Sequence, residues 1–429
     1  MDRFVVRPGD SLHGTVSAGG AKNSALKLMA ACLLAEGRHV LAGVPRIVDV
    51  EIMAEVLEAI GAQVDRGPDG PHGGPGDLVI DTPATLVPEA PYELVEKMRA
   101  SVVVLGPLLA RTGRASVSLP GGDDFGNRPI DIHLHGLSTL GAVFETVHGN
   151  IEGSVPGGAE GRLVGQRVVF EYPSHTATDN VLMAAVLAKG TTVIENAARE
   201  PEVSDLADFL THMGARIRGA GTSHIEVDGV DELHPSPQSH RVIPDRVVAA
   251  TLLSAVAMAG GDIVIEDGRP DHMDMVLRKM GDLGVTVTQG PEGMRATSTD
   301  RLHSVDVATL PYPGVATDYK PFLVTMLSVA DGVGIVTENL FAGRFRYVDE
   351  LRRMGADIRT EGHHAVVRGV RRLSGAPVRA PDLRAGAALV LAGMMAEGET
   401  VVSDAQHIDR GYEDLAATLS SLGADVTRA

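Results

Sequence analysis

The chain has 429 residues, of which 44% are hydrophobic, and a formal net charge of −18. At roughly 100–200 residues per domain, this length predicts at least two domains with substantial apolar cores. The acidic balance excludes a general nucleic-acid binder, which would carry a basic footprint. It still allows a local basic pocket that binds a small anion.

The beginning of the chain carries no secretory signal and reads as a strand over residues 1–6. Its single cysteine, Cys32, lies in the apolar run 30–34, which predicts an inert core residue and excludes internal disulfides. The longest uncharged apolar run, residues 247–261, is shorter than the roughly 18 residues of a membrane span. We therefore expect a cytoplasmic globular protein without a membrane partner.

Two glycine marks recur along the chain and divide it into six repeats. The first is an apolar residue, Gly, a small or apolar residue, any residue and then Val, Ile or Phe. Its glycines stand at positions 61, 141, 214, 284, 355 and 423. The second is an Ala/Leu-rich run that ends in Gly before a β-rich stretch, with glycines at positions 37, 113, 190, 260, 332 and 398. Glycine just past a helix takes the left-handed conformation, so each repeat predicts two helices and several strands.

The six repeats predict two similar α/β domains of three repeats each, because one repeat could not bury its helices and its sheet alone. The polar, proline-containing segment 233–238 stands between the third and fourth repeats and predicts the crossing between the domains. Residues 66–77 are dense in Gly and Pro and predict an exposed hairpin loop.

Four polar segments interrupt the repeats. In the first, residues 19–24, glycine amides, a helix start and Lys22 form a combination that suits an anion. An ordinary helix cap with a surface lysine explains it equally. In the second, residues 119–133, Arg128 could clamp a carboxylate or a phosphate, or lie in a solvated hairpin.

The third and fourth segments lie in the C-terminal half. Asp318 stands at the entry to a predicted helix, where capping alone would explain an acid. Arg384 opens an apolar helix predicted over residues 385–396. A cation at a helix start is unfavourable unless an anion meets it, so this segment favours a ligand.

Across essentially the whole chain, these segments resemble the enolpyruvyl transferase family, and within it the UDP-N-acetylglucosamine 1-carboxyvinyltransferases. The resemblance implies two inside-out α/β barrel domains with the active site in the cleft between them. The implied domains are residues 22–235, with a mobile loop over 119–128, and residues 1–21 plus 236–429. The motifs that carry it are at residues 20–23, 98–101, 105–108, 120–122, 128–133, 195–202, 245–246, 317–318, 344–345, 382–385 and 407–413.

The implied reaction transfers enolpyruvyl from phosphoenolpyruvate to a sugar 3-hydroxyl of a uridine nucleotide, through a tetrahedral ketal phosphate, and releases phosphate. No metal or organic cofactor is implied. Asp318 matches the carboxylate beside the acceptor hydroxyl, which is taken as the general base. By resemblance, the fixed cations are Lys22, Arg128 and Arg384, with Arg99 and Arg344 nearby. The other implied substrate contacts are Asn23, Pro129, Ile130, Asp131, Ile132, Ser174, His175, Thr176 and Leu340.

Two departures from the family bear on function. Many members carry a reactive loop cysteine where this chain has Asp123, which can still protonate the substrate methylene if its pKa is raised. The adjacent Asp124 leaves open which acid acts. A carboxylate cannot be alkylated as a thiol is, which predicts resistance to the epoxide antibiotic fosfomycin. On the acceptor side, Thr176 replaces a family glycine where the backbone meets the diphosphate, and His175 adds a donor that could take a terminal phosphate.

Three functions remain open at this point. The leading one is transfer to UDP-N-acetylglucosamine, the first committed step of peptidoglycan synthesis. The acceptor-side changes favour an alternative, a paralogue that uses UMP in nucleoside-antibiotic assembly. A non-catalytic nucleotide-binding regulator is disfavoured by the intact Lys22, Arg128, Asp318 and Arg384. The segment 128–131 matches the family's uracil cradle and argues against a shikimate-type acceptor.

Overall fold

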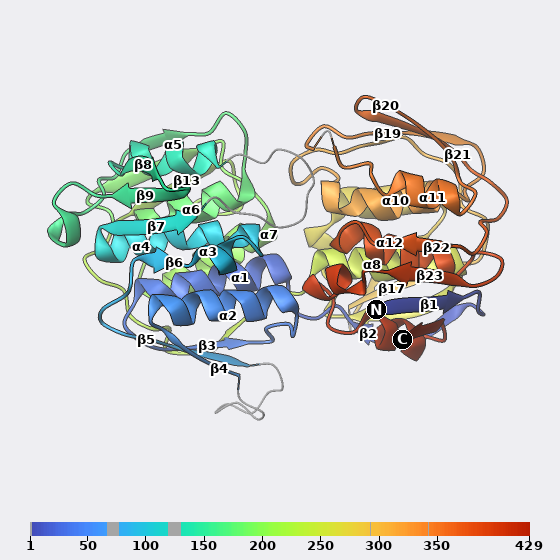
Figure 1. Ribbon diagram of the computed structural model, residues 1–429, viewed down its shortest axis with the longest axis horizontal. Coiled ribbons are helices and arrows are strands. Elements are labelled where there is room, and N and C mark those ends of the chain that lie inside the picture. Colours follow the sequence, from blue (N-terminus) through green and yellow to red (C-terminus); the bar gives the residue numbers. More distant parts are fainter. Residues whose placement is uncertain (1, 67–76, 119–129, 292, 342) are drawn as a thin grey trace. The chain divides into compact units, whose positions relative to one another are not determined.

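The computed structural model describes residues 2–66, 77–118, 130–291, 293–341 and 343–429. Within these ranges the chain forms two compact units (Figure 1). We call residues 20–243 the N-terminal unit, and residues 2–19 with 244–429 the C-terminal unit. Each unit has its own core of buried aliphatic side chains.

The described strands form six four-stranded sheets of one topology, three in each unit. In every sheet an edge strand runs parallel to its neighbour, and the other two strands are antiparallel. In sheet order, the N-terminal unit holds β14 (His240–Arg241), β3 (Gly37–Ala42), β5 (Leu78–Thr82) and β4 (Gln63–Arg66); β6 (Glu89–Ala90), β7 (Arg114–Ser118), β9 (Asn150–Ser154) and β8 (Val143–Val147); and β10 (Arg167–Val169), β11 (Thr191–Glu195), β13 (His224–Asp228) and β12 (Arg216–Arg218). The C-terminal unit holds β2 (Leu12–Ser17), β15 (Gly261–Glu266), β17 (Gly293–Ser298) and β16 (Thr286–Gly290); β18 (Val307–Ala308), β19 (Val333–Thr337), β21 (His364–Arg368) and β20 (Asp357–Glu361); and β22 (Pro377–Arg379), β23 (Thr400–Ser403), β1 (Arg3–Arg7) and β24 (Asp425–Arg428).

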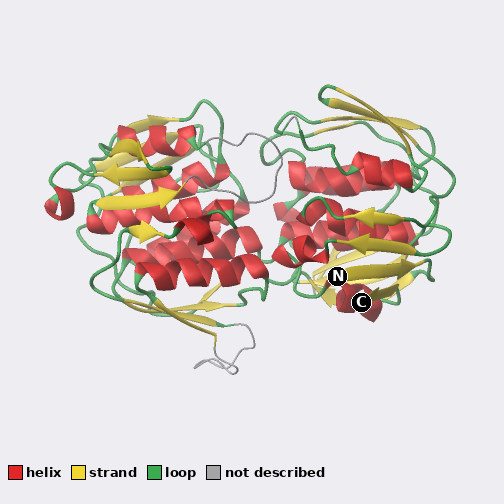
Figure 2. Cartoon of the chain, viewed as in Figure 1, coloured by secondary structure: helices red, strands yellow, loops and turns green. Residues whose placement is uncertain are grey.

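Each repeat also carries a buried helix before its central strand and an outer helix after it. Within each unit, the strands lie outward of the buried helices, which is the inside-out arrangement (Figure 2). The buried helices are α1 (Lys22–Ala31), α4 (Leu105–Thr112), α6 (His175–Ala185), α8 (Arg246–Ala259), α10 (Lys320–Leu327) and α12 (Leu383–Gly393). The outer helices are α2 (Val48–Ile60), α5 (Asp131–Thr139), α7 (Pro201–His212), α9 (Asp274–Leu283), α11 (Val348–Arg353) and α13 (Leu415–Ser421). A further short helix, α3 (Tyr92–Val95), follows β6.

The glycine marks have the backbone conformation that the repeat predicts. All twelve of these glycines have positive φ, between 67° and 118°. L-residues with a side chain avoid this region, which explains why glycine recurs at the helix ends. The predicted division into six repeats, three in each unit, is therefore confirmed within the described residues.

The chain passes between the units after Gly19 and after Ile243, not at the predicted boundaries 21/22 and 235/236. Residues 236–243 belong to the N-terminal unit because β14 pairs with β3, with His240 opposite Leu41. The two crossings exchange edge strands. β2 precedes α1 in the chain but pairs with β15, and β14 precedes α8 but pairs with β3.

Glycine is required at the first crossing. A Cβ on Gly20 would lie 2.0 Å from the carbonyl oxygen of Gly43, so the backbones could not approach with any other residue. Cys32 is fully buried, and its Sγ donates to the Leu28 oxygen, as expected for an inert core residue. Most of the predicted loop 66–77 lies outside the described residues. No helix among the described residues is both long enough and apolar enough to cross a membrane.

Candidate active site

Asp318 lies between two buried arginines of the C-terminal unit. It belongs to the 3-10 turn η5 (Thr317–Tyr319), which leads into α10, so the predicted helix entry is correct. Arg344 Nη1 donates to Asp318 Oδ1 at 2.8 Å, and Arg384 Nε donates to Oδ2 at 3.4 Å. The arginine side chains are 3% and 2% exposed, whereas that of Asp318 is 28% exposed. The carboxylate is therefore the solvent-facing member of a cluster with two fixed cations.

Both arginines keep their charge despite burial. Burial lowers the pKa of Arg344, but the carboxylates of Asp318 and Asp382 outweigh it, and the net pKa is raised. The pKa of Arg384 is also raised, because Tyr412, Asp318 and other groups outweigh the effect of burial. Such permanent charges, held in place before a ligand arrives, are suited to binding an anion.

Arg384 stands in the first turn of α12, where the sequence predicted an anion. The Asp382 side chain caps this helix and accepts from the backbone amides of Arg384 and Ala385, both at 2.9 Å. The guanidinium carbon lies 5.4 Å from the centre of the Tyr412 ring. Nη1 is buried and has no hydrogen-bond partner among the described residues. A buried donor left without an acceptor costs about 1–3 kcal/mol, so this atom points to a ligand that would accept from it.

A buried ion pair that the sequence did not reveal supports this cluster. Lys320 Nζ lies 2.7 Å from Glu338 Oε2, and both side chains are fully buried. Glu338 accepts from the hydroxyls of Thr309 and Thr317, both at 2.7 Å, and Lys320 donates to the Arg344 carbonyl at 2.5 Å. Thr317 also accepts from Arg344 Nη1 at 3.1 Å. Glu338 and Lys320 thus fix the residues that hold Asp318.

The pKa values of both members of this pair lie below their usual values. Burial lowers the pKa of Lys320 to about 8 although Glu338 opposes the shift. Burial raises the pKa of Glu338, but Lys320 and the two threonine hydroxyls outweigh it, so the net pKa is lowered. The predicted site residue Leu340 joins this network through its backbone amide, which donates to Glu338 Oε1 at 2.8 Å. A glutamate directly after the alternating strand β19 was the only sequence signal for Glu338.

In the N-terminal unit, Lys22 occupies the first turn of α1. Its Nζ lies 2.5 Å from Asp49 Oδ2, and the side chain is only 11% exposed. The alternative of a surface lysine is therefore wrong. Asn23 follows it and is partly exposed. This position provides a positive charge at a helix N-terminus, which is the combination that favours anions.

The start of α6 carries three predicted substrate contacts: Ser174 is the N-cap, and His175 and Thr176 form the first turn. His175 Nε2 lies 3.2 Å from Lys27 Nζ and 3.5 Å from Asp179 Oδ2. Lys27 and Asp179 are buried and were not predicted as site residues. His175 is thus held by the buried side chains of Lys27 and Asp179, the latter one turn further along α6.

His133 connects this helix start to the segment that resembles the uracil cradle. Burial, with the nearby charge of Arg99, lowers the pKa of His133 to about 3, so the ring is neutral at neutral pH. Its Nδ1 accepts from Asn180 Nδ2 at 3.1 Å, which leaves the proton on Nε2, 3.4 Å from Thr176 Oγ1. The structure thereby brings the α5 start, where Ile130, Asp131 and Ile132 lie, next to the α6 start.

Three predicted site residues, Asp123, Arg128 and Pro129, lie outside the described residues. The roles assigned to the loop 119–128 remain predictions. Arg99 is partly exposed and begins the 3-10 helix η2 (Arg99–Val104).

Comparison with known proteins identifies the family. Residues 6–419 match the model of the EPSP synthase (3-phosphoshikimate 1-carboxyvinyltransferase) family. The chain belongs to this family. Curated relatives named UDP-N-acetylglucosamine 1-carboxyvinyltransferase include those of Nocardia farcinica, 50% identical over 427 residues (100% of this chain, 98% of the relative), and Mycobacterium bovis, 51% identical over 429 residues (100% and 99%).

Solved structures give the same fold. The enolpyruvyl transferase NikO from Streptomyces tendae superposes with a TM-score of 0.87 at 25% identity, covering 100% of this chain and 99% of that one. An EPSP synthase from Acinetobacter baumannii has a TM-score of 0.75 at 18% identity, covering 100% of both chains, and supports the fold alone. The predicted family, the two-barrel fold and the carboxyvinyltransferase class are confirmed.

Proposed function

We propose that this enzyme transfers the enolpyruvyl group of phosphoenolpyruvate to the sugar 3-hydroxyl of UDP-N-acetylglucosamine and releases phosphate. The observation that carries the proposal is the full-length identity of about half with relatives that bear this name. The Asp318 cluster supports it, because it joins a solvent-facing carboxylate to two fixed cations, one of which, Arg384, has a buried Nη1 without an acceptor among the described residues.

Each step of the reaction has a matching residue. Asp318 takes the proton of the acceptor hydroxyl as the hydroxyl oxygen bonds to C2 of phosphoenolpyruvate, while a loop acid protonates C3. The product of this addition is a tetrahedral ketal phosphate. The deprotonated loop acid then takes a proton back from C3 as the bond between C2 and the phosphate oxygen breaks, which restores the double bond and releases phosphate. Arg344 and Arg384 hold the carboxylate and phosphate charges through both steps, and by resemblance Lys22 and Arg128 add further positive charge.

We assign the protonation of C3 to Asp123, by its match to the family's loop cysteine. This assignment predicts that fosfomycin does not inactivate the enzyme, because a carboxylate at this position lacks the nucleophilic thiolate. The measurement is the residual activity after preincubation with fosfomycin over time. Time-dependent inactivation at modest concentration would refute the assignment. Activity retained by Asp123→Ala and lost by Asp124→Ala would move the role to Asp124.

UMP is the alternative acceptor. One observation favours it: the side chains of His175 and Thr176 at the start of α6. The relatives named UDP-N-acetylglucosamine 1-carboxyvinyltransferase share about half of the residues over the full chain. UDP-N-acetylglucosamine is therefore the better supported acceptor.

The deciding experiment measures phosphate release from phosphoenolpyruvate with UDP-N-acetylglucosamine or with UMP, against a reaction without acceptor. Release with UDP-N-acetylglucosamine at a kcat/KM at least a hundred times that with UMP is expected. Release with UMP alone would establish the alternative. Release with neither, from protein that still binds a uridine nucleotide, would favour a regulator.

A further inference from the structure

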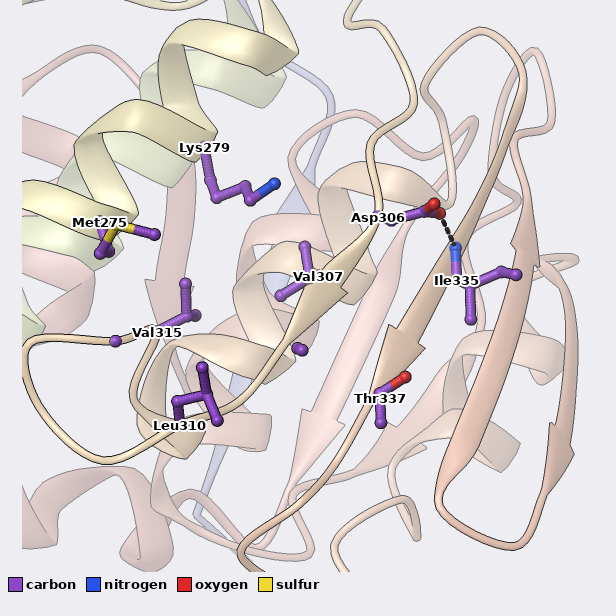
Figure 3. Close-up of a pocket in the computed structure, with 10 residues that line it drawn as sticks. Met275, Lys279, Asp306, Val307, Leu310, Val315, Ile335 and Thr337 are labelled. Carbon is purple, nitrogen blue, oxygen red and sulfur yellow. Dashed lines mark hydrogen bonds between the residues drawn. The ribbon is translucent and has the colours of Figure 1, made fainter.

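A pocket of about 410 Å³ lies in the C-terminal unit, on the outer side of the sheet β18-β19-β21-β20. Figure 3 shows it between α9 and the segment that contains β18 and the following loop. Helix α9 contributes Met275 and Lys279, which stand one turn apart on one face. Strand β19 contributes Ile335 and Thr337, which share its outer face because side chains alternate along a strand.

The pocket wall is unusually apolar for an exposed position. Leu310 is 50% exposed, Ile335 44% and Met275 37%, and all three line it. Val307 and Val315 extend the same surface inward. Large apolar side chains that gather around a concave surface mark a binding site more often than scattered ones do, and the volume is within the usual range of small-molecule pockets, roughly 300–1,000 Å³.

Two opposite charges border this apolar surface. Lys279 reaches from α9 toward the side on which Asp306 lies (Figure 3). The nearest carboxylate that holds the ammonium is that of Asp282, at 3.7 Å on the exposed helix face. Asp306 Oδ1 accepts from the Ile335 backbone amide at 2.8 Å, and because an ionised carboxylate has about four acceptor sites, it can also accept from a cation. The charges complement a molecule that carries both a carboxylate and an ammonium group.

The pocket wall continues directly into the network that holds Asp318. Val315 precedes Thr317 by two residues, and the loop that carries it is closed by the Leu310 amide, which donates to the Val315 oxygen at 3.0 Å. Thr337 in the wall precedes Glu338, which accepts from Thr317 at 2.7 Å. An occupant that packs on Leu310 and Val315 would therefore restrain the backbone that leads to the proposed base.

We propose that this pocket binds a free amino acid with a large apolar side chain, its carboxylate on Lys279, its ammonium on Asp306 and its side chain on Leu310 and Ile335. Occupancy tightens the segment 310–318. The binding itself does not depend on the proposed function, since no residue of the pocket is assigned to the reaction.

Calorimetric titration of the full chain with L-phenylalanine and L-leucine tests the binding. Three probes isolate each element of the ligand: 3-phenylpropionate lacks the ammonium, phenethylamine lacks the carboxylate, and glycine lacks the apolar side chain. Each is expected to bind at least tenfold more weakly than L-phenylalanine. Failure of both amino acids to bind at millimolar concentration, or equal binding of 3-phenylpropionate, would overturn the proposal.

Two variants separate the charges without removing the packing. Lys279→Gln is expected to weaken L-phenylalanine at least tenfold and to leave phenethylamine unchanged. Asp306→Asn keeps an oxygen for the Ile335 amide, and it should weaken L-phenylalanine while leaving 3-phenylpropionate unchanged. Unaltered L-phenylalanine binding in either variant would overturn the assigned contacts.

Hydrogen exchange tests the link to the network with a readout other than activity. Saturating L-phenylalanine is expected to slow exchange of the backbone amides in residues 310–319 at least threefold. In Asp306→Asn, the exchange of the same backbone amides should not slow at the same ligand concentration. Binding without any change in this segment would overturn the coupling and leave only an isolated site.

Discussion

Each unit contains a lysine–carboxylate pair whose side chains are at most 3% exposed, Lys27–Asp179 and Lys320–Glu338, and the two pairs differ in how the carboxylate is held. In the C-terminal unit, Glu338 is 2.7 Å from Lys320 and also accepts from two threonines and two backbone amides. In the N-terminal unit, Asp179 is 3.4 Å from Lys27. Lys27 and His175, the latter at 3.5 Å, are the nearest donors, and neither carboxylate oxygen has a close hydrogen bond within the described residues.

The pKa values of the two carboxyl groups are consequently shifted in opposite directions. The pKa of Glu338 is lowered although burial opposes it, because Lys320 and the donors stabilise the charged form. The pKa of Asp179 is raised to about 7, because burial and the nearby Glu200 and Glu202 outweigh the attraction of Lys27. A buried lysine alone therefore does not keep a carboxylate ionised. The hydrogen bonds around the carboxylate decide it.

The most severe test removes the carboxylate that the C-terminal network presents to solvent. Asp318→Asn keeps the shape and a hydrogen-bond acceptor for Arg344 but removes the basic oxygen. We expect turnover to fall about 10²–10⁴-fold, while the nucleotide affinity changes less than threefold. Steady-state kinetics and a nucleotide titration check this. Turnover within tenfold of the wild type would refute the role of Asp318 as base.

The next test breaks the well-bonded pair itself. Glu338→Gln leaves Lys320 buried without its counter-charge, so we expect the C-terminal unit to lose about 3–5 kcal/mol of unfolding free energy. Because the pKa of Glu338 is lowered, its contribution is complete above the unfolded-state pKa and is lost only as pH falls below it. In the variant, Lys320 lacks the counter-charge that opposes the effect of burial, so its pKa falls below the value of about 8 and the lysine loses its proton more readily. The neutral amine costs less to bury, so urea titrations should give a smaller loss at pH 8 than at pH 6. An equal or larger loss at pH 8 would contradict this account.

The poorly bonded pair predicts a pH dependence that arises from its carboxyl group. Between the ordinary aspartate pKa of about 4 and the value of about 7 at Asp179, the folded protein binds more protons than the unfolded chain. The stability of the wild type at this site therefore falls as pH rises through that window. Asp179→Asn lacks this titration, so its stability relative to the wild type should rise from pH 5 to pH 8, by about 3 kcal/mol at most. A pH-independent difference would contradict the raised pKa.

The smallest effect separates positioning from stability within the Glu338 network. Thr309 and Thr317 both donate to Glu338 at 2.7 Å, but only Thr317 also accepts from Arg344. Each substitution by Val should cost about 1–2 kcal/mol of stability. Only Thr317→Val is expected to lower kcat, about threefold to tenfold, because it releases Arg344. Equal kcat in the two variants would show that Thr317 acts on stability alone.

The repeat architecture could be predicted from the sequence because its marks are local. A positive φ after each helix demands glycine at a fixed place, and twelve such places give the period, the number of repeats and the two units. The position of the second crossing could not be predicted. The polar, proline-containing segment 233–238 predicts a boundary, but the pairing of His240 with Leu41 places residues 236–243 in the N-terminal unit. Pairing between distant strands leaves no local mark in the sequence.

The candidate site divides in the same way. Arg384 could be predicted because a cation at a helix start is locally unfavourable, and Asp318 and Arg344 followed from resemblance. Glu338, Lys27 and Asp179 could not, because a charged residue beside a strand or within a helix is usually solvated. Their burial depends on partners that come from distant elements, such as Thr309 for Glu338.

The closure of the sixth sheet has a consequence for the order of folding during synthesis. Strand β1 pairs with β23 and β24, and the Arg3 amide donates to the oxygen of Ala429 at 3.1 Å. Strand β1 is therefore synthesised before every other described strand and waits for β23 and β24. All strands of the N-terminal unit are present once residue 241 has emerged, so that unit can fold while residues 3–7 are still without partners.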